Sequence, residues 1–283
     1  MTPFSASDAA LEGFQLIRAR WRLVLGWCLF SVLGFVSLLI LAFFAIVTAT
    51  LAVSTKDQAS TAGGVIGGLV LGLGGAAIQW VVLAALYRME LRPKTPPGLY
   101  YLRLSRDEAR LFGLWLTLTA LFVAMMTAGF VALRWLGQVS GAAAGVATVA
   151  FLVLVAWLSI RTSLAGPANF ATGRFGLTDS WRLTRGRVWP LLGMILLALC
   201  LLALIAIAIF IVTAVVQAAI GGFHTLAPVS LSDPEALAQR PGAYVFALIA
   251  ELVIAPLYLV IAQAPFLAAY RALAASVENV EEA

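Results

Sequence analysis

One carboxylate stands inside an apolar run, where its chemistry would be unusual. Glu251 lies in the run AELVIAPLYLVIAQAPF. An ionisable side chain within a membrane-spanning helix is costly and by default marks a proton or ion pathway. Tyr258 lies seven residues further along the same predicted helix, and Gln217 lies near the end of the preceding apolar run. These three residues form a candidate intramembrane polar site. We favour the simpler interpretation, in which Glu251 is close enough to the interface to be hydrated or ion-paired.

A second candidate is the basic stretch at 174–193, RFGLTDSWRLTRGRVWPLLG. Arginines near an anionic membrane surface contribute about 1 kcal/mol each to binding, and tryptophans anchor a segment at the interface. The candidate contacts with anionic lipid headgroups are Arg174, Trp181, Arg182, Arg185, Arg187 and Trp189. A simpler role is to fix orientation, with the side chains extending into water. The two roles are compatible.

Other catalytic or ligand-binding motifs are not evident, and we predict that the protein is not an enzyme. His224 is the only histidine, and Cys28 and Cys200 fall inside separate apolar runs. A multi-histidine metal site or a disulfide framework therefore cannot be built. The glycine-rich stretch at 63–75 lacks the Lys-Ser/Thr ending of a phosphate loop, and its four-residue glycine spacings favour close helix packing instead. We expect no cofactor and no bound metal.

The elements that position these residues are membrane spans. Apolar residues make up 63% of the chain and charged residues 11%, against about 45–50% and about 25% in soluble domains. Roughly 20 apolar residues suffice to cross a bilayer. We predict an all-α integral membrane protein, a single domain over 1–283 with six transmembrane helices arranged as three hairpins. The expected spans are about 23–53, 63–87, 111–136, 142–164, 189–220 and 245–270.

Short amphipathic elbow helices are predicted before the first and fifth spans, at about 5–21 and 176–188. The apolar face of the first comprises Leu11, Phe14, Ile17 and Trp21. Such a helix beside a span is expected to lie in the membrane interface, and either Ser5 or Ser7 is a suitable N-cap. Ser105 and Glu108 match a capping box, which predicts the start of another helix there.

The basic residues are distributed very unevenly between the two sides of this topology. Fifteen of the eighteen fall in the N-terminal segment, in 88–110, in 161–188 or at Arg271. The other three are Lys56, Arg134 and Arg240. Under the positive-inside rule both termini are cytoplasmic. Basic residues confined to short loops between spans also argue against a nucleic-acid partner, despite the net charge of +5. The expected partner is the lipid bilayer, and protein partners stay open.

The chain also shows internal similarity that favours three units, each an elbow followed by a hairpin. Aligning the first elbow with the third places Glu12 on Asp179, and a degenerate middle elbow is expected around 104–113. The returning spans end alike, as Leu86-Tyr87-Arg88, Ser159-Ile160-Arg161 and Ala269-Tyr270-Arg271. Units of like orientation differ from the inverted repeats common in secondary transporters. A small secondary transporter that uses Glu251 is nevertheless the alternative function.

The string SWRLTRGRVWPLLG resembles a pattern, S/AW-x-L-T-x-G-x-x-W-x-L-x-G, in a broad group of bacterial multi-span membrane proteins. That group includes the membrane domain attached to some glycerophosphoryl diester phosphodiesterases. The matching positions are Ser180, Trp181, Leu183, Thr184, Gly186, Trp189, Leu191 and Gly193. The phosphodiesterase domain itself would need catalytic histidines and hundreds of further residues. The resemblance therefore implies a membrane module of the bacterial inner membrane, non-catalytic and lipid-associated, rather than phosphodiesterase activity.

Overall fold

The computed structural model describes residues 5–51, 56–92, 100–103, 105–221 and 239–281, and these form helices without any strand. The prediction of an all-α protein is confirmed. Six helices are long and apolar enough to cross a membrane, which points to a multi-pass membrane protein. They are α2 (Trp21–Leu51), α3 (Lys56–Leu91), α4 (Arg106–Val139), α5 (Gly141–Thr162), α8 (Val188–Gly221) and α10 (Pro241–Glu281). The shorter helices are α1 (Ala6–Ala19), α6 (Ala165–Thr172) and α7 (Leu177–Leu183).

The long helices coincide with the predicted spans, and most of them extend further. Helix α3 begins at Lys56, before the predicted start of the second span at 63, and α10 continues well past 270. The capping box forms as predicted, because the Ser105 amide donates to Glu108 Oε2 at 2.7 Å. Ser5 caps α1. Most of the segment between the fifth and sixth predicted spans, 222–238, lies outside the described residues, and so does His224.

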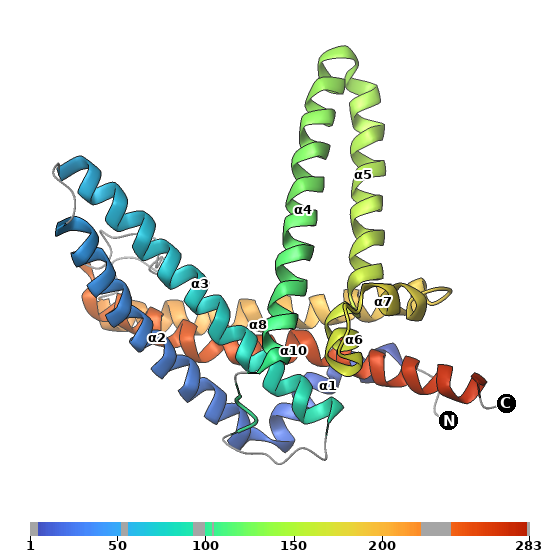
Figure 1. The fold of residues 1–283 in the computed structure, drawn as a ribbon, viewed down its shortest axis with the longest axis horizontal. Helices are drawn as coiled ribbons and strands as arrows, with labels where there is room; N and C mark the ends of the chain where they lie inside the picture. Colours follow the sequence, from blue (N-terminus) through green and yellow to red (C-terminus); the bar gives the residue numbers. More distant parts are fainter. Residues whose placement is uncertain (1–4, 52–55, 93–99, 104, 222–238, 282–283) are drawn as a thin grey trace.

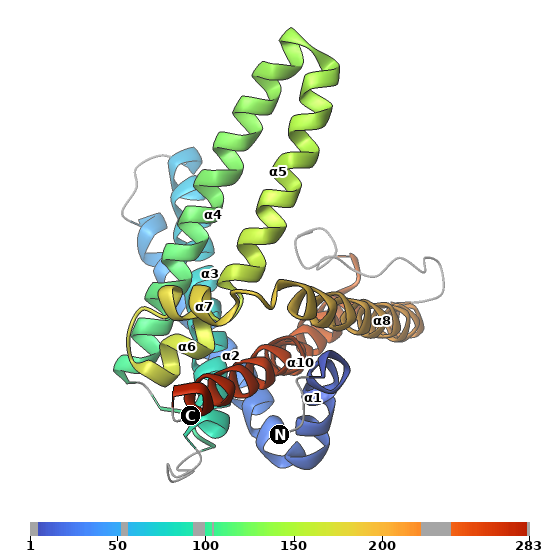
Figure 2. The ribbon, with the colours of Figure 1, turned by 90° about the vertical axis from the view of Figure 1, so that its right-hand side faces the viewer.

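Consecutive long helices pack in pairs, α2 with α3, α4 with α5 and α8 with α10. The pairs diverge from a common base (Figure 1), and the α4–α5 pair points away from α8 and α10 in both views (Figures 1 and 2). The α4–α5 pair buries almost none of its apolar length. The main core lies at the base, around Trp27, Tyr87, Leu111, Phe170 and Leu267. The base is therefore where the three pairs are positioned.

Glycines of α3 allow its close approach to α2. A Cβ at Gly74 would lie 2.4 Å from Leu38 Cδ2, and one at Gly67 would lie 2.7 Å from Ile46 Cδ1. A second set of glycines spaced four residues apart in the same stretch is Gly64, Gly68 and Gly72. It has no described atom within 4 Å of its Cβ positions. Only one of the two glycine stripes therefore serves helix packing in the described part of the chain.

Helix α1 packs across α8 and α10 through its small residues. Its buried residues are Ala9, Ala10, Gly13 and Leu16. A Cβ at Gly13 would stand 2.7 Å from Ile261 Cα, so the two backbones nearly touch. Leu11 and Trp21, from the predicted apolar face, are 41% and 53% exposed. The predicted apolar face is therefore divided, because Ile17 packs against the core whereas Leu11 and Trp21 stay exposed.

The segment at 161–188, between the fourth and fifth predicted spans, contains more helix than we predicted. It contains α6, which the sequence analysis missed, and its residues Ala165, Pro167, Ala168, Asn169 and Phe170 are buried. Helix α7 ends at Leu183, short of the predicted 188. Gly186 then adopts a left-handed φ of 76° before α8 begins. This region is therefore a folded joint rather than a single amphipathic helix.

Candidate functional site

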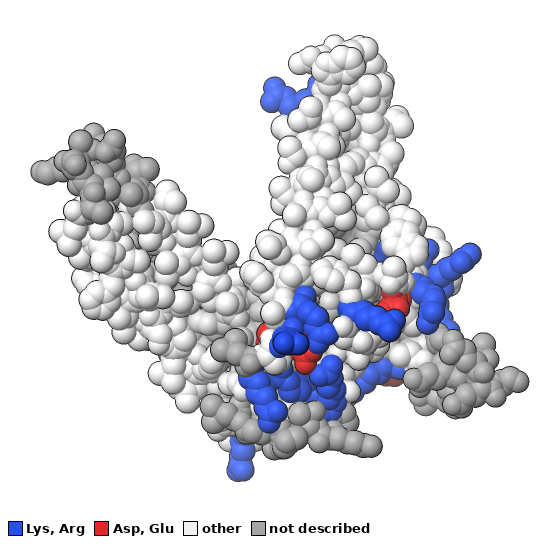
Figure 3. All heavy atoms as spheres, in the orientation of Figure 1, with Lys and Arg blue, Asp and Glu red and all other residues white. Residues whose placement is uncertain are grey.

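Basic side chains gather at the base from which the helix pairs diverge (Figure 3). The structure separates their arginines into two groups. The side chains bound within the protein are Arg88, Arg92, Arg110, Arg161 and Arg271. The exposed ones, whose guanidinium groups make no hydrogen bond or ion pair with described residues, include Arg174, Arg182, Arg185 and Arg187. The first group builds the base, and the second is available to ligands.

Arg88 joins the end of α3 to the start of α4 through a buried ion pair. Arg88 and Glu108 are 4% and 5% exposed, and the Arg88 guanidinium donates to Glu108 Oε1. Glu108 Oε2 also accepts from the Ser105 amide and hydroxyl. Removing one partner of such a pair strands the other charge, at a cost of about 3–5 kcal/mol. This contact therefore fixes how the first two helix pairs meet.

Two tyrosines before α4 form a strained turn that contacts Arg88 of this ion pair. Tyr100 and Tyr101 have φ values of 54° and 62°, and such left-handed residues cost about 1–3 kcal/mol each. Both carbonyls are held, Tyr100 O by Trp27 Nε1 at 2.9 Å and Tyr101 O by Arg88. A Cβ at Gly26 would lie 2.8 Å from the Tyr100 ring. The turn is thus anchored on both α2 and α3.

A second ionic contact attaches α6 to the same place. Arg92 pairs with Asp107 at 2.9 Å and donates to Phe170 O at 2.9 Å. Its guanidinium also lies 4.9 Å from the centroid of the Phe170 ring. Arg110 pairs with Asp107 and donates to Gly173 O at the end of α6. Helix α6 is therefore held by Arg92, directly after α3, and by Arg110 of α4.

Arg161, at the end of α5, contacts residues of the SWRLTRGRVWPLLG motif at 180–193. It donates to Trp181 O at 3.0 Å and to Thr184 Oγ1 at 3.3 Å. Its guanidinium lies 5.4 Å and 5.1 Å from the ring centroids of Trp157 and Trp181. The Ser180 hydroxyl donates to Arg161 O at 2.6 Å, and Ser180 and Thr184 are fully buried. The motif therefore builds a joint between α5 and α7.

Arg271 connects the last long helix, α10, to α1. It pairs with Glu12 of α1 and with Glu90 of α3, both at 2.6 Å. Arg88 and Arg161 lie in the last turns of α3 and α5, and Arg271 lies ten residues before the end of α10. Each of the three binds the segment before another helix pair. For Arg271 that segment is α1, at the opposite end of the chain. The three contacts therefore link the units in a closed order, from first to second to third and back to first.

The candidate lipid contacts lie on the exposed side of the α5–α7 joint. Trp189 is 81% exposed at the start of α8, and Trp181 is 42% exposed. The Trp181 ring is perpendicular to that of Trp157 at 5.1 Å, so part of its role is structural. In sequence, Arg182, Arg185 and Arg187 lie between the two tryptophans, around the turn at Gly186. The segment therefore carries several arginines without a guanidinium partner among the described residues, together with two exposed indole rings.

The structure does not bring together Glu251, Tyr258 and Gln217. The Tyr258 hydroxyl donates to Leu202 O of α8 at 3.3 Å. Gln217 lies fifteen residues further along α8, which is about 22 Å at 1.5 Å per residue. Glu251 is exposed, whereas Gln217 is buried and has an interaction partner. These residues therefore occupy separate levels of the α8–α10 pair.

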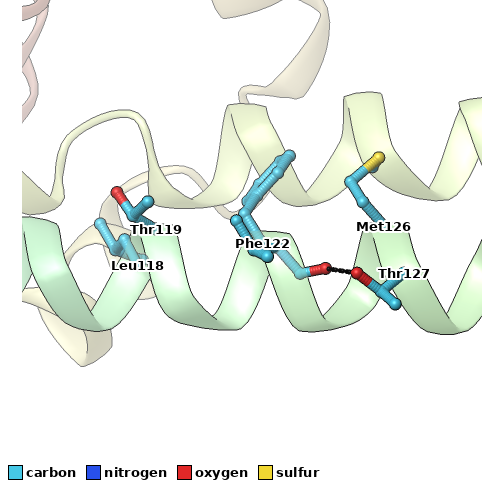
Figure 4. A pocket seen from close by; sticks show the side chains of 6 residues that line it. Leu118, Thr119, Phe122, Met126 and Thr127 are labelled. Atoms are coloured by element: carbon cyan, nitrogen blue, oxygen red, sulfur yellow. Dashed lines mark hydrogen bonds between the residues drawn. The ribbon is translucent and has the colours of Figure 1, made fainter. Parts of the chain in front are cut away.

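Hollows that are formed by α4 alone offer little polar chemistry. One of about 440 Å³ is formed by α4 alone, around Phe122, Met126 and Thr127 (Figure 4). The Thr127 hydroxyl donates to the Val123 carbonyl of its own helix at 2.8 Å. Within the described ranges, no three His, Cys, Asp or Glu side chains gather as metal ligands. This surface is what a helix facing lipid presents.

The joint around Arg88 and Glu108 was only partly foreseen. The capping box was readable from the S-x-x-E spacing, but the partner of Glu108, twenty residues away in α3, was not. Comparison with known proteins adds no relative. No protein-family model, no curated protein and no solved structure matches the chain.

Proposed function

We propose that this protein is a non-catalytic membrane module of the bacterial inner membrane that holds anionic phospholipid headgroups at its basic base. One observation carries the proposal. Arg174, Arg182, Arg185 and Arg187 are exposed without a guanidinium partner among the described residues, while neighbouring arginines are used internally. The resemblance of the Trp181–Trp189 motif to bacterial membrane domains supports the same assignment.

The proposal places both termini in the cytoplasm and the elbows in the membrane interface. The uneven distribution of basic residues supports this orientation, and the exposed Leu11 and Trp21 of the first elbow are suited to the acyl boundary. A cysteine introduced at Ser5 should react with impermeant maleimide only after spheroplasts are lysed, whereas one at Ser140 should react before lysis. Labelling in the reverse order would contradict the orientation.

Lipid binding can be tested by native mass spectrometry of the detergent-extracted protein with phosphatidylglycerol and phosphatidylcholine. A triple variant, Arg182→Gln with Arg185→Gln and Arg187→Gln, should lose most of its preference for phosphatidylglycerol. The expected loss is about fivefold per arginine, from about 1 kcal/mol each.

The matched control removes the same number of charges from the first elbow, at Arg18, Arg20 and Arg22, whose side chains are also exposed. This control should keep most of the preference. An equal loss in both variants would show that net charge alone attracts lipid, and the proposed headgroup site would then be abandoned.

A further inference from the structure

We propose that the groove between α3 and α4 binds one anionic phospholipid, with an acyl chain in the groove and the phosphate at Arg106. The groove lies where the first two helix pairs begin to diverge (Figure 1) and has a volume of about 470 Å³. That volume is within the ~300–1,000 Å³ of small-molecule sites. Its apolar lining includes Ala77 and Trp80 of α3 and Ala109 and Phe112 of α4.

The walls of the groove are aromatic and come from both helices. The rings of Trp80 and Trp115 lie 5.4 Å apart across the α3–α4 contact, and Phe112 packs 5.9 Å from Trp115. The small residues Ala77 and Ala109 also line the groove, and both are exposed. In a bilayer a gap between two apolar helices gains dispersion contacts when a hydrocarbon chain fills it. The walls therefore select a flexible apolar chain.

The charges at one end of the groove select a negative headgroup. Glu108 borders the groove, but its carboxylate is bound by Arg88 and Ser105. Arg106 is exposed, and its guanidinium has no hydrogen bond or ion pair to a described residue. The first turn of α4 adds the partial positive charge of a helix N-terminus. The positive charge at this end of the groove therefore favours an anionic headgroup, in which no cationic group such as choline balances the phosphate.

This site shares no residue with the arginines of the α7 segment. It requires only that α3 and α4 lie in a membrane, so either lipid site can fail without the other. Labelling that is mapped to individual helices distinguishes the two sites.

The test uses the full chain in nanodiscs that contain phosphatidylglycerol with a diazirine in its acyl chain. After irradiation and digestion, adducts should concentrate at 77–81 and 109–112. Ala77→Phe and Ala109→Phe each fill the groove from an exposed position and should reduce these adducts at least severalfold. Ala120→Phe, an equal enlargement at an exposed position elsewhere on α4, should leave them unchanged.

Headgroup selection is tested with Arg106→Gln, which should lower the ratio of phosphatidylglycerol to phosphatidylcholine adducts about fivefold. Adducts spread evenly along α2 to α5 in the unaltered protein would overturn the site. So would equal labelling of the groove-filling variants and Ala120→Phe. Equal labelling by the two lipids in the unaltered protein would overturn the anionic specificity.

Discussion

Arg271 and Glu12 are 259 positions apart in the sequence and form an ion pair of 2.6 Å. Through this contact the last long helix binds the elbow that precedes the first helix pair. Arg271 also pairs with Glu90, so one side chain joins α10, α1 and α3. Together with the contacts of Arg88 and Arg161, the Arg271 contact links the three helix pairs in a closed order.

Reversing this pair should separate its contribution from that of overall charge. Arg271→Glu leaves three carboxylates together and should destabilise the protein by about 1 kcal/mol or more, since partly exposed pairs contribute about 0.2–1 kcal/mol and like charges repel. Adding Glu12→Arg should recover part of the loss. Unfolding free energies in mixed micelles provide the measurement. A double variant as unstable as the sum of both single variants would show no coupling.

The buried pair of Arg88 and Glu108 should be far more sensitive. Arg88→Ala leaves a buried carboxylate that keeps only its contacts to Ser105, so we expect a loss of about 3–5 kcal/mol. Arg103→Ala, at an exposed arginine nearby, should change stability by less than about 0.5 kcal/mol. The same unfolding assay compares the two variants. Similar losses would mean that the pair does not hold α3 against α4.

Two glycines of the motif should respond in opposite directions to alanine. Gly186 has a φ of 76°, where an added Cβ costs about 1–2 kcal/mol. Gly193 lies inside α8 with open space at its Cβ position, so alanine should be neutral or stabilising by up to about 1 kcal/mol. Thermal melts of both variants in one detergent test the contrast. A destabilised Gly193→Ala would point to a contact made by that helix face elsewhere.

The α4–α5 pair should change its orientation when it enters a bilayer. Both this pair and α8–α10 expose apolar surface that must cross the same hydrocarbon layer of about 30 Å, yet they point in different directions (Figure 2). Spin labels at Ser140 and Ala219 of a Cys28→Ser, Cys200→Ala variant would report their separation. In nanodiscs the distance should be shorter than in the diverging arrangement. An unchanged distance would show that the base holds the pairs rigidly apart.

The sequence by itself determined the six long helices and the start of α4. An apolar run of roughly 20 residues leaves the backbone little choice but a helix when water is absent. The capping of α4 by Ser105 and Glu108 was equally local, because it spans only one turn. The packing between helices could not be predicted in the same way. In α1, Leu16 and Ile17 pack against the core whereas Leu11 is exposed, and Gly13 sits against Ile261.

The roles of the arginines were decided only by the tertiary structure. Arg161 and Arg185 lie in the same basic segment, and nothing in their residue type separates them. Arg161 is enclosed because Trp157, Trp181 and Thr184 converge on it from two helices, whereas Arg185 stays exposed at the turn before α8. Helix α6 was missed for a related reason, since its eight residues are stabilised by distant Arg92 and Arg110. Contacts between residues far apart in sequence depend on how the helices meet, and no local pattern encodes that.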